Sequence, residues 1–238
     1  MSKVAFITGG ATGIGFACAV QLGQEGYKIF IISRSEDKLK KASKKFDKAV
    51  PEGFIAYKNC DVSRETELRK AFQACIEIYG RIDVLINAAA IIQTKEFDKF
   101  NSAEFDQLMA INVRGTVLAS HFAYQEMLKQ KSAGAIINIS SLGGIAHTEK
   151  FPGFSSYVTS KFAITGFTES LAAESKKHNI RVNAVAPGAV ATDMLKKAAP
   201  GLKTSVKPDD IAKTICYLCD YEKSGHINGS IMVINSNE

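Results

Sequence analysis

The sequence of 238 residues is short of cysteine and proline, with 5 of each, and it has no long hydrophobic run. No apolar stretch approaches the ~18 residues of a membrane span, so we expect no membrane association. The first apolar run, residues 4–8, is too short for the core of a signal peptide. An odd number of cysteines without an export signal indicates reduced thiols, and we therefore expect a cytoplasmic protein.

The shortage of proline also bears on domain organisation. No proline- or glycine-rich linker, internal repeat or low-complexity segment divides the chain. Hydrophobic residues make up 46% of the sequence, which is enough apolar surface for one sizeable core. We therefore expect a single domain over residues 1–238.

Positive charge is in slight excess, and it is concentrated. The formal net charge is +6, yet six lysines crowd residues 38–48. This distribution predicts a local anionic partner or a solvated basic helix, and not nucleic-acid binding, because the stretch offers no aromatic platform for bases.

Two cysteines form a Cys-x-x-Cys pattern, Cys216 and Cys219, within an apolar stretch of helical period. No second Cys/His pair lies nearby in the sequence, so we interpret both as core residues and expect no metal site.

Short apolar runs alternate with longer amphipathic ones along the whole chain. The short runs predict strands at residues 4–8, 28–32, 54–58, 84–87, 135–140, 181–186 and 230–234. Helical patterns occupy residues 14–25, 36–48, 64–79, 103–130, 155–177 and 209–220. Strict alternation indicates an α/β fold, a doubly wound parallel sheet of about seven strands with helices on both faces, which is a three-layer Rossmann fold.

A glycine-rich turn joins the first expected strand to the first expected helix. It reads Thr8-Gly9-Gly10-Ala11-Thr12-Gly13-Ile14-Gly15. Glycines here let the backbone turn tightly and approach a pyrophosphate, whose charge is stabilised by the free amide hydrogens of the helix N-terminus. The spacing alone also fits an ordinary strand-to-helix turn, but its place in the first βα unit favours a nucleotide.

The second and third strands end in residues that bear on the choice of nucleotide. Ser33 and Arg34 stand where NAD-binding folds usually carry an acid for the ribose 2′-hydroxyl. An arginine here favours the 2′-phosphate of NADP by roughly ten- to a hundredfold, because a charge-assisted contact contributes about 1.5–3 kcal/mol. Asp61 follows the third strand, where a carboxylate accepts from an adenine amino group or simply caps the next helix.

Tyr157 and Lys161 are four residues apart in a helical segment, so both side chains project from one face. An ammonium about 5 Å from the phenol favours the phenolate by ~3 kcal/mol, or about two pKa units. This would bring Tyr157 into the range of general acid–base catalysis. Alone, such a pair is usually just a helix surface pair, but Asn138-Ile139-Ser140-Ser141 ends the strand before it and Pro187-Gly188 ends the strand after it.

Together these motifs resemble the short-chain dehydrogenase/reductase family, in its compact single-domain branch, and most of all its 3-oxoacyl-acyl-carrier-protein reductases and related ketone reductases. The motifs that carry the resemblance occur in the family's order and spacing over nearly the whole chain: Thr8-Gly9-x-x-x-Gly13-Ile14-Gly15, Asn87-Ala-Ala, Asn112-Val-x-Gly115, Ser141, Tyr157-x-x-x-Lys161 and Pro187-Gly188-x-Val190-x-Thr192.

The resemblance implies a role for each catalytic residue. Tyr157 would protonate the substrate carbonyl, Lys161 would lower the pKa of Tyr157 and hold the cofactor ribose, and Ser141 would hydrogen-bond the reacting oxygen. Asn112 would fix a water beside Lys161, or alternatively cap or kink its own helix. The implied cofactor-binding residues are Gly9, Thr12, Gly13, Ile14, Gly15, Ser33, Arg34, Asp61, Val62, Asn87, Tyr157, Lys161, Pro187, Gly188, Val190 and Thr192.

Three features depart from the family pattern. Ala88 and Ala90 replace an asparagine that braces the sheet and a glycine that gives the cofactor room. His147 lies in an extended loop, where it contacts substrate or is an ordinary surface histidine. The segment 192–207 is short, which predicts a small lid and an open site.

The resemblance implies an enzyme that reduces a ketone with NADPH in preference to NADH, and a 3-oxoacyl thioester on acyl carrier protein or coenzyme A is the leading substrate, as in fatty acid biosynthesis. The alternatives are an enzyme for another small ketone, a sugar or a polyol, and a catalytically silent nucleotide-binding relative. Apolar residues on the 155–177 helix predict a homodimer or homotetramer: Phe162, Ile164, Phe167 and Leu171.

Overall fold

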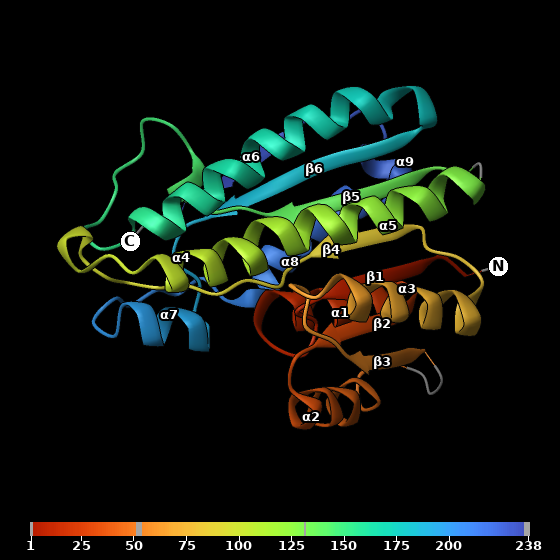
Figure 1. The fold of residues 1–238 in the computed structure, drawn as a ribbon. Coiled ribbons are helices and arrows are strands. Elements are labelled where there is room, and N and C mark those ends of the chain that lie inside the picture. The colour runs from red at the N-terminus through yellow and green to blue at the C-terminus, as the bar shows by residue number, and fades with distance from the viewer. Residues whose placement is uncertain (1, 51–53, 131, 236–238) are drawn as a thin grey trace.

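The computed structural model describes residues 2–50, 54–130 and 132–235, and its centre is a seven-stranded sheet (Figure 1). The strand order is β3-β2-β1-β4-β5-β6-β7, and every neighbouring pair is parallel. The strands are β1 Val4–Thr8, β2 Lys28–Ser33, β3 Ile55–Asn59, β4 Val84–Asn87, β5 Gly134–Ile139, β6 Ile180–Pro187 and β7 Ile231–Ile234. The α/β fold with a doubly wound parallel sheet is thus confirmed.

Helices connect the strands and cover both faces of the sheet. The α-helices are α1 Gly13–Gln24, α2 Glu36–Phe46, α3 Glu65–Tyr79, α4 Ser102–Met109, α5 Gly115–Gln130, α6 Ser155–Ser175, α7 Asp193–Ala198, α8 Pro208–Cys219 and α9 Tyr221–Ser224. Short 3₁₀ turns lie at Phe97–Lys99, Leu142–Gly144 and Lys176–His178. The short helices α7 and α9 were not predicted from the sequence.

Alternate residues of each strand feed two separate hydrophobic cores. Ile7 and Ile31 point to the core beneath α1, α2 and α8, whereas Phe6 and Phe30 point to the core beneath α3, α5 and α6. The period of two in a β-strand produces this division. Figure 1 shows α5 and α6 running along one face, with α8 on the other side of the sheet. The three layers expected from the sequence are therefore present.

The helix expected over residues 103–130 contains an irregularity in its middle. A π-helical turn, Ala110–Arg114, lies between α4 and α5. Such turns are rare and occur mostly as single bulges, frequently at functional sites. The turn contains Asn112, which is buried.

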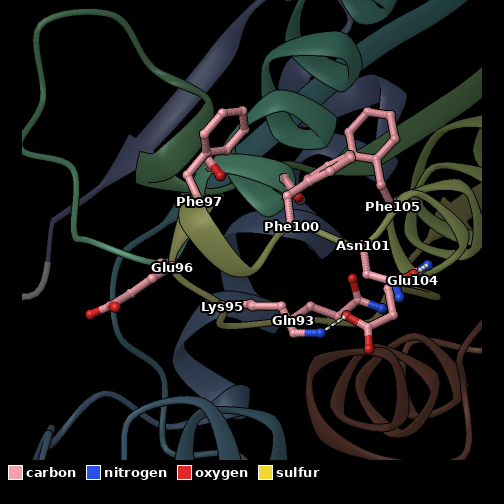
Figure 2. Close-up of a pocket in the computed structure, with 11 residues that line it drawn as sticks. Gln93, Lys95, Glu96, Phe97, Phe100, Asn101, Glu104 and Phe105 are labelled. Atoms are coloured by element: carbon pink, nitrogen blue, oxygen red, sulfur yellow. Dashed lines mark hydrogen bonds and ion pairs between the residues drawn. The ribbon is translucent and has the colours of Figure 1, made fainter.

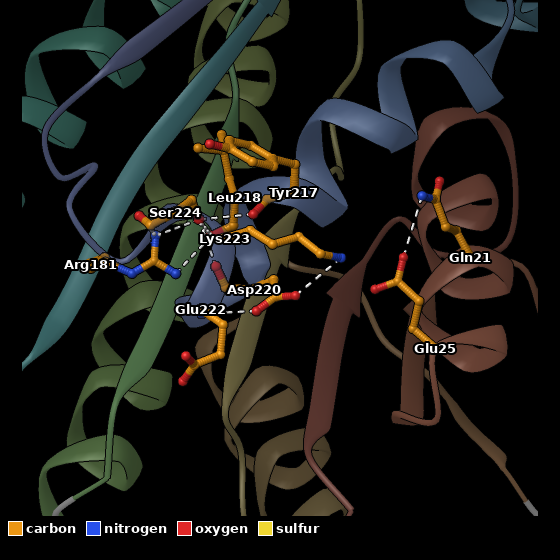
Figure 3. A network of polar contacts seen from close by, with 9 residues as sticks. All are labelled: Gln21, Glu25, Arg181, Tyr217, Leu218, Asp220, Glu222, Lys223 and Ser224. Atoms are coloured by element: carbon orange, nitrogen blue, oxygen red, sulfur yellow. Dashed lines mark hydrogen bonds and ion pairs between the residues drawn. The ribbon is translucent and has the colours of Figure 1, made fainter.

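A buried arginine ties the C-terminal helices to the sheet (Figure 3). The guanidinium of Arg181, at the start of β6, donates to the main-chain oxygens of Leu218 at 2.8 Å and Ser224 at 3.1 Å. It also donates to the Ser224 hydroxyl at 3.3 Å. These acceptors lie at the end of α8 and in α9, where helical carbonyls lack partners within the helix. Arg181 therefore acts as a cap inside the protein.

All five cysteines are free and buried: Cys18, Cys60, Cys75, Cys216 and Cys219. Cys216 and Cys219 belong to the core between α8 and the sheet, so their interpretation as core residues is confirmed. Over the described residues, no group of three or more His, Cys, Asp and Glu side chains is placed to hold a metal ion. None of the helices in these ranges is long and apolar enough to cross a membrane.

Candidate active site

The glycine-rich turn after β1 leaves the N-terminus of α1 open. Thr12 is the N-cap residue, but its side chain makes no capping hydrogen bond, and the first turn carries no acidic residue. Gly9 has φ +65°, and a Cβ there would lie 2.8 Å from the Ala89 nitrogen. A Cβ on Gly15 would lie 2.7 Å from the Gly9 oxygen, so glycine is required at both positions. Free amide groups beside a glycine-rich turn fit a dinucleotide pyrophosphate.

The end of β2 presents a free cation. Arg34 is exposed, and within residues 2–50, 54–130 and 132–235 its guanidinium makes no hydrogen bond or ion pair. Its main-chain oxygen accepts from Asn59 Nδ2 at 2.8 Å, which fixes the backbone between β2 and β3. Ser33 is the last residue of β2, and Ser35 caps α2 by accepting from the Lys38 amide. The lysines of α2 lie on its exposed face, opposite the buried Leu39, Ala42 and Phe46.

Asp61, after β3, holds a turn ahead of α3. Its Oδ1 accepts from the Ser63 amide at 2.9 Å and from the Ser63 hydroxyl at 2.7 Å. The N-cap residue of α3 is Arg64, so Asp61 does not cap this helix and instead fixes the turn before it. Val62 is buried, and a Cβ on Gly115 would lie 2.9 Å from it, so the turn packs closely against the start of α5.

Asn87, at the end of β4, braces the sheet. Its Nδ2 donates to Ser120 Oγ at 3.0 Å and to Asn138 Oδ1 at 2.9 Å. Its own Oδ1 is buried and has no partner among the described residues. Asn87 therefore links β4 to β5 and α5, a bracing role that the family pattern assigns to the next position, where this chain has Ala88.

The turn after β4 is fixed to the end of β1. Thr8 Oγ1 accepts from the amides of Ala88 and Ala89, each at 3.1 Å. A Cβ on Gly15 would lie 3.2 Å from the Ala88 Cβ, so this turn and α1 are in close contact. Thr8 was not singled out as a site residue, although its position before the first glycine is a signal that could have found it.

Asn112 holds the π-helical turn against two other segments. Its Oδ1 accepts from the Ile91 amide at 2.8 Å, and its Nδ2 donates to the Ile91 oxygen at 2.9 Å. Nδ2 also donates to Ser160 Oγ at 3.1 Å, and Ser160 Oγ donates to the Tyr157 oxygen at 2.7 Å. A chain of hydrogen bonds therefore runs from the β4 loop to the helix that carries Tyr157. Sequence reasoning missed Ser160, which lies one turn after Tyr157.

Lys161 and Tyr157 lie together on α6. Lys161 Nζ is 5.5 Å from the centre of the Tyr157 ring and donates to the Ile139 oxygen at 2.8 Å. Burial raises the pKa of Tyr157 to about 12, an effect that a hydrogen bond with the Ser141 side chain partly offsets. Burial also lowers the pKa of Lys161 to about 8.

Burial, and not Lys161, therefore sets the direction of the Tyr157 pKa, so the expectation that Lys161 lowers this pKa is wrong. Desolvation disfavours the charged form of both groups, and the ammonium of Lys161 is directed to a main-chain oxygen. Both side chains are consequently held toward their neutral forms. For Tyr157 this form is a phenol, which can give up a proton.

The two serines at the end of β5 face in different directions, as alternation along a strand predicts. Ser141 bonds with Tyr157 and accepts from the Gly143 amide at 3.1 Å. The Ser140 hydroxyl is buried instead and donates to the Lys161 oxygen at 3.1 Å. The structure therefore brings Ser141, and not Ser140, to the phenol.

The segment after β6 returns to the glycine-rich turn. Pro187 ends β6, and the Gly188 amide donates to the Ile234 oxygen at 2.9 Å. Val190 is buried. Thr192 caps α7 by accepting from the Leu195 amide at 3.2 Å.

Two observations complete the rim of the site. A Cβ on Gly13 would lie 3.6 Å from the Thr192 methyl group, so the two segments expected to bind the cofactor meet. His147 is exposed and has φ +61°, and its side chain makes no hydrogen bond or ion pair in the described part of the chain.

Comparison with known proteins agrees with this geometry. The family model of short chain dehydrogenases matches residues 3–203. Carbonyl reductase family member 4 of Xenopus tropicalis is 35% identical over 99% of this chain and 97% of the relative. The 3-oxoacyl-(acyl-carrier-protein) reductase of Aquifex aeolicus is 31% identical over 98% of this chain and 96% of the relative.

Solved structures share the whole fold. Levodione reductase superposes with a TM-score of 0.90 at 29% identity, over 98% of this chain and 95% of that one. A structure described as ElxO with NADP bound superposes with a TM-score of 0.88 at 30% identity, over 99% and 98% of the two chains.

Proposed function

The chain belongs to the short-chain dehydrogenase/reductase family, and we propose that it reduces a ketone to a secondary alcohol with NADPH. The observation that carries this proposal is the meeting of Ser141, Tyr157 and Lys161 at the carboxyl edge of the sheet, beside the open N-terminus of α1. Ligands of open parallel sheets bind at this edge.

The residues of the chain divide the chemistry among them. A bound nicotinamide supplies the hydride, and Tyr157 gives its phenolic proton to the carbonyl oxygen. A pKa of about 12 keeps Tyr157 protonated at neutral pH, which suits reduction. Ser141 donates to the same oxygen as negative charge develops there. Lys161, when protonated, stabilises the negative charge left on Tyr157, and Asn112 holds the helix that carries both.

The preference for NADPH rests on Arg34. The free guanidinium at the end of β2 supports binding of a 2′-phosphate, and the exposed lysines of α2 add positive potential. The solved relative with NADP bound is consistent with this preference.

The proposed substrate is a 3-oxoacyl thioester carried on acyl carrier protein or coenzyme A, in fatty acid biosynthesis in the cytoplasm. The reductase of Aquifex aeolicus, at 31% identity, supports this choice. The carbonyl reductase at 35% identity supports the second candidate, an enzyme for another ketone. A catalytically silent relative is the least supported alternative, because Ser141, Tyr157 and Lys161 are all present.

We also propose a homodimer or homotetramer through α5 and α6. Phe162 of α6 and Val117 and Leu128 of α5 are exposed apolar residues, whereas Ile164 is buried within the subunit. Size-exclusion chromatography with light scattering tests this, and a monomer would contradict it.

The test of the reaction follows NADPH absorbance with acetoacetyl thioester and a panel of unrelated ketones. Thioester turnover that disappears in Tyr157→Phe supports the proposed reductase. Tight NADPH binding with no turnover of any ketone supports the silent relative. Turnover that survives in Tyr157→Phe would remove Tyr157 from the role of proton donor.

A further inference from the structure

A row of aromatic side chains leads from the surface to Tyr157. The ring centre of Phe154 lies 6.4 Å from that of Tyr157, with the rings at 78°. The ring of Phe151 lies 6.3 Å from that of Phe154, at 65°. Both pairs have the edge-to-face geometry that aromatic rings prefer. Phe151 is 59% exposed, so the row begins in solvent and ends at the phenol.

A second aromatic group stands on the neighbouring segment. The Lys95 amide donates to the Gly153 oxygen at 2.9 Å, which joins the loop after β4 to the loop before α6. Phe97 is 74% exposed, and its ring lies 5.7 Å from that of Phe100. Figure 2 shows the small hollow that these two rings line. Gly153, Ser155 and Ser156 also line it, so it adjoins the segment that carries Phe154.

The two lysines nearest these rings, Lys95 and Lys150, are already engaged. Lys95 pairs with Glu104, so neither charge is left alone (Figure 2). Lys150 Nζ donates to the main-chain oxygens of Ile145 at 2.8 Å and Thr148 at 2.9 Å. Neither lysine is therefore free to bind a ligand, and the apolar surface between solvent and Tyr157 in this loop is that of Phe151 and Phe154.

We propose that Phe151 and Phe154 determine the substrate class by binding an apolar chain attached to the ketone, which favours medium-length acyl or alkyl ketones over sugars and polyols. This inference rests on the proposed function, because it takes Tyr157 as the group that meets the carbonyl. The row continues directly from Tyr157, so a chain extending from the reacting carbon is the occupant. A hydroxylated chain would lose water on these two rings, which themselves offer it no hydrogen-bond partner in exchange.

The size of the effect follows from the apolar area covered. A fully buried methylene contributes ~0.8 kcal/mol, about a fourfold change, and a methylene lying on a half-open aromatic surface contributes about half of that. We therefore expect kcat/KM to rise about two- to fourfold with each added methylene until the row is covered.

The experiment compares 3-oxobutanoyl, 3-oxohexanoyl and 3-oxooctanoyl thioesters of pantetheine, the alkan-2-ones from butanone to decanone, and dihydroxyacetone. In Phe151→Ser, kcat/KM for the 3-oxooctanoyl thioester should fall about tenfold, while kcat/KM for the 3-oxobutanoyl thioester should change less than twofold. Ile78→Ser is the matched control, because Ile78 is equally exposed, at 56%, but lies on α3. It should change neither value.

The outcomes separate this inference from the proposed substrate. Reduction of long alkan-2-ones but of no thioester overturns the thioester and supports the apolar subsite. Equal kcat/KM across chain lengths, or a preference for dihydroxyacetone, overturns the subsite and leaves the reductase standing. If no compound is reduced, calorimetric titration of the NADP-loaded protein with the same alkan-2-ones decides: affinity that does not rise with length, or that Phe151→Ser leaves unchanged, overturns the subsite.

Discussion

The ammonium nitrogen of Lys161 lies 5.5 Å from the centre of the Tyr157 ring, and its hydrogen bond goes to the main-chain oxygen of Ile139. Burial moves the two pKa values in opposite directions, to about 8 for Lys161 and about 12 for Tyr157. A protonated Lys161 at this buried site therefore lowers the stability of the folded protein. A cost of this kind is typical of residues retained for chemistry.

The first prediction is that Lys161→Met stabilises the protein while abolishing turnover. The pKa of Lys161 falls from 10.5 to about 8 on folding, which corresponds to a cost of about 3 kcal/mol below pH 8. The variant also loses the hydrogen bond to the Ile139 oxygen, which lowers its stability by about 1 kcal/mol. We expect a net gain of about 2 kcal/mol at pH 7 in urea unfolding.

The pH dependence provides the check on Lys161. Between pH 8 and 10.5 the unfolded lysine binds more protons than the folded one, so wild-type stability rises relative to the variant. The advantage of Lys161→Met should therefore shrink as the pH rises through this window. A constant difference from pH 7 to 10.5 would show that Lys161 has an ordinary pKa in the folded protein.

The second prediction concerns Arg34. Arg34→Asp should raise the Kd for NADPH by roughly ten- to a hundredfold, because it replaces a charge-assisted contact with repulsion, and should leave NADH binding equal or tighter. Calorimetric titration with each nucleotide measures both values. Lys44→Asp is the control, since it makes the same change of charge in the last turn of α2, the basic helix that follows Arg34. An unchanged ratio of the two Kd values in Arg34→Asp would place Arg34 outside the site.

The sheet could be predicted from the sequence because buried parallel strands appear as continuous apolar runs. β1 and β4 have the predicted bounds, Val4–Thr8 and Val84–Asn87. The helix α7 could not be found in this way, because it has 6 residues and none of them is buried. No apolar period marks such a helix.

The site was predicted in its residue types but not in its interactions. Spacing placed Tyr157 and Lys161 on one face of a helix, but it carried no information on burial or on the bond from Lys161 to the Ile139 oxygen. The expected direction of the shift in the Tyr157 pKa was therefore wrong. The π-helical turn at Asn112 depends on contacts with Ile91 and Ser160, which are 21 and 48 residues away. Contacts at this distance leave no periodic signal in the sequence.

The third prediction tests the internal cap at Arg181. Arg181→Met should destabilise the protein by about 2 kcal/mol, because buried carbonyl oxygens of Leu218 and Ser224 lose their donors. Urea unfolding monitored by circular dichroism measures this change. Arg64→Met is the control, since the Arg64 guanidinium forms an exposed ion pair with Glu67. Its loss should cost about 0.5 kcal/mol or less. Equal effects of the two substitutions would show that the Arg181 network contributes nothing.

The last prediction separates positioning from stability within α6. Ser160 and Ser175 are both buried, and each hydroxyl donates to the main-chain oxygen three residues before it, at 2.7 Å to Tyr157 and 3.2 Å to Ala172. Only Ser160 also accepts from Asn112. Ser160→Ala and Ser175→Ala should therefore lower stability similarly, by about 1 kcal/mol.

Their effects on turnover should differ. Ser160→Ala leaves an Asn112 amide hydrogen without its partner and frees the turn of α6 that carries Tyr157, so we expect kcat to fall about tenfold with KM for NADPH little changed. Ser160→Thr, which keeps the hydroxyl, should restore most of the rate, and Ser175→Ala should retain it. If Ser160→Ala and Ser175→Ala lose equal activity, the loss reflects general destabilisation, and the hydrogen bond from Asn112 to Ser160 does not position Tyr157.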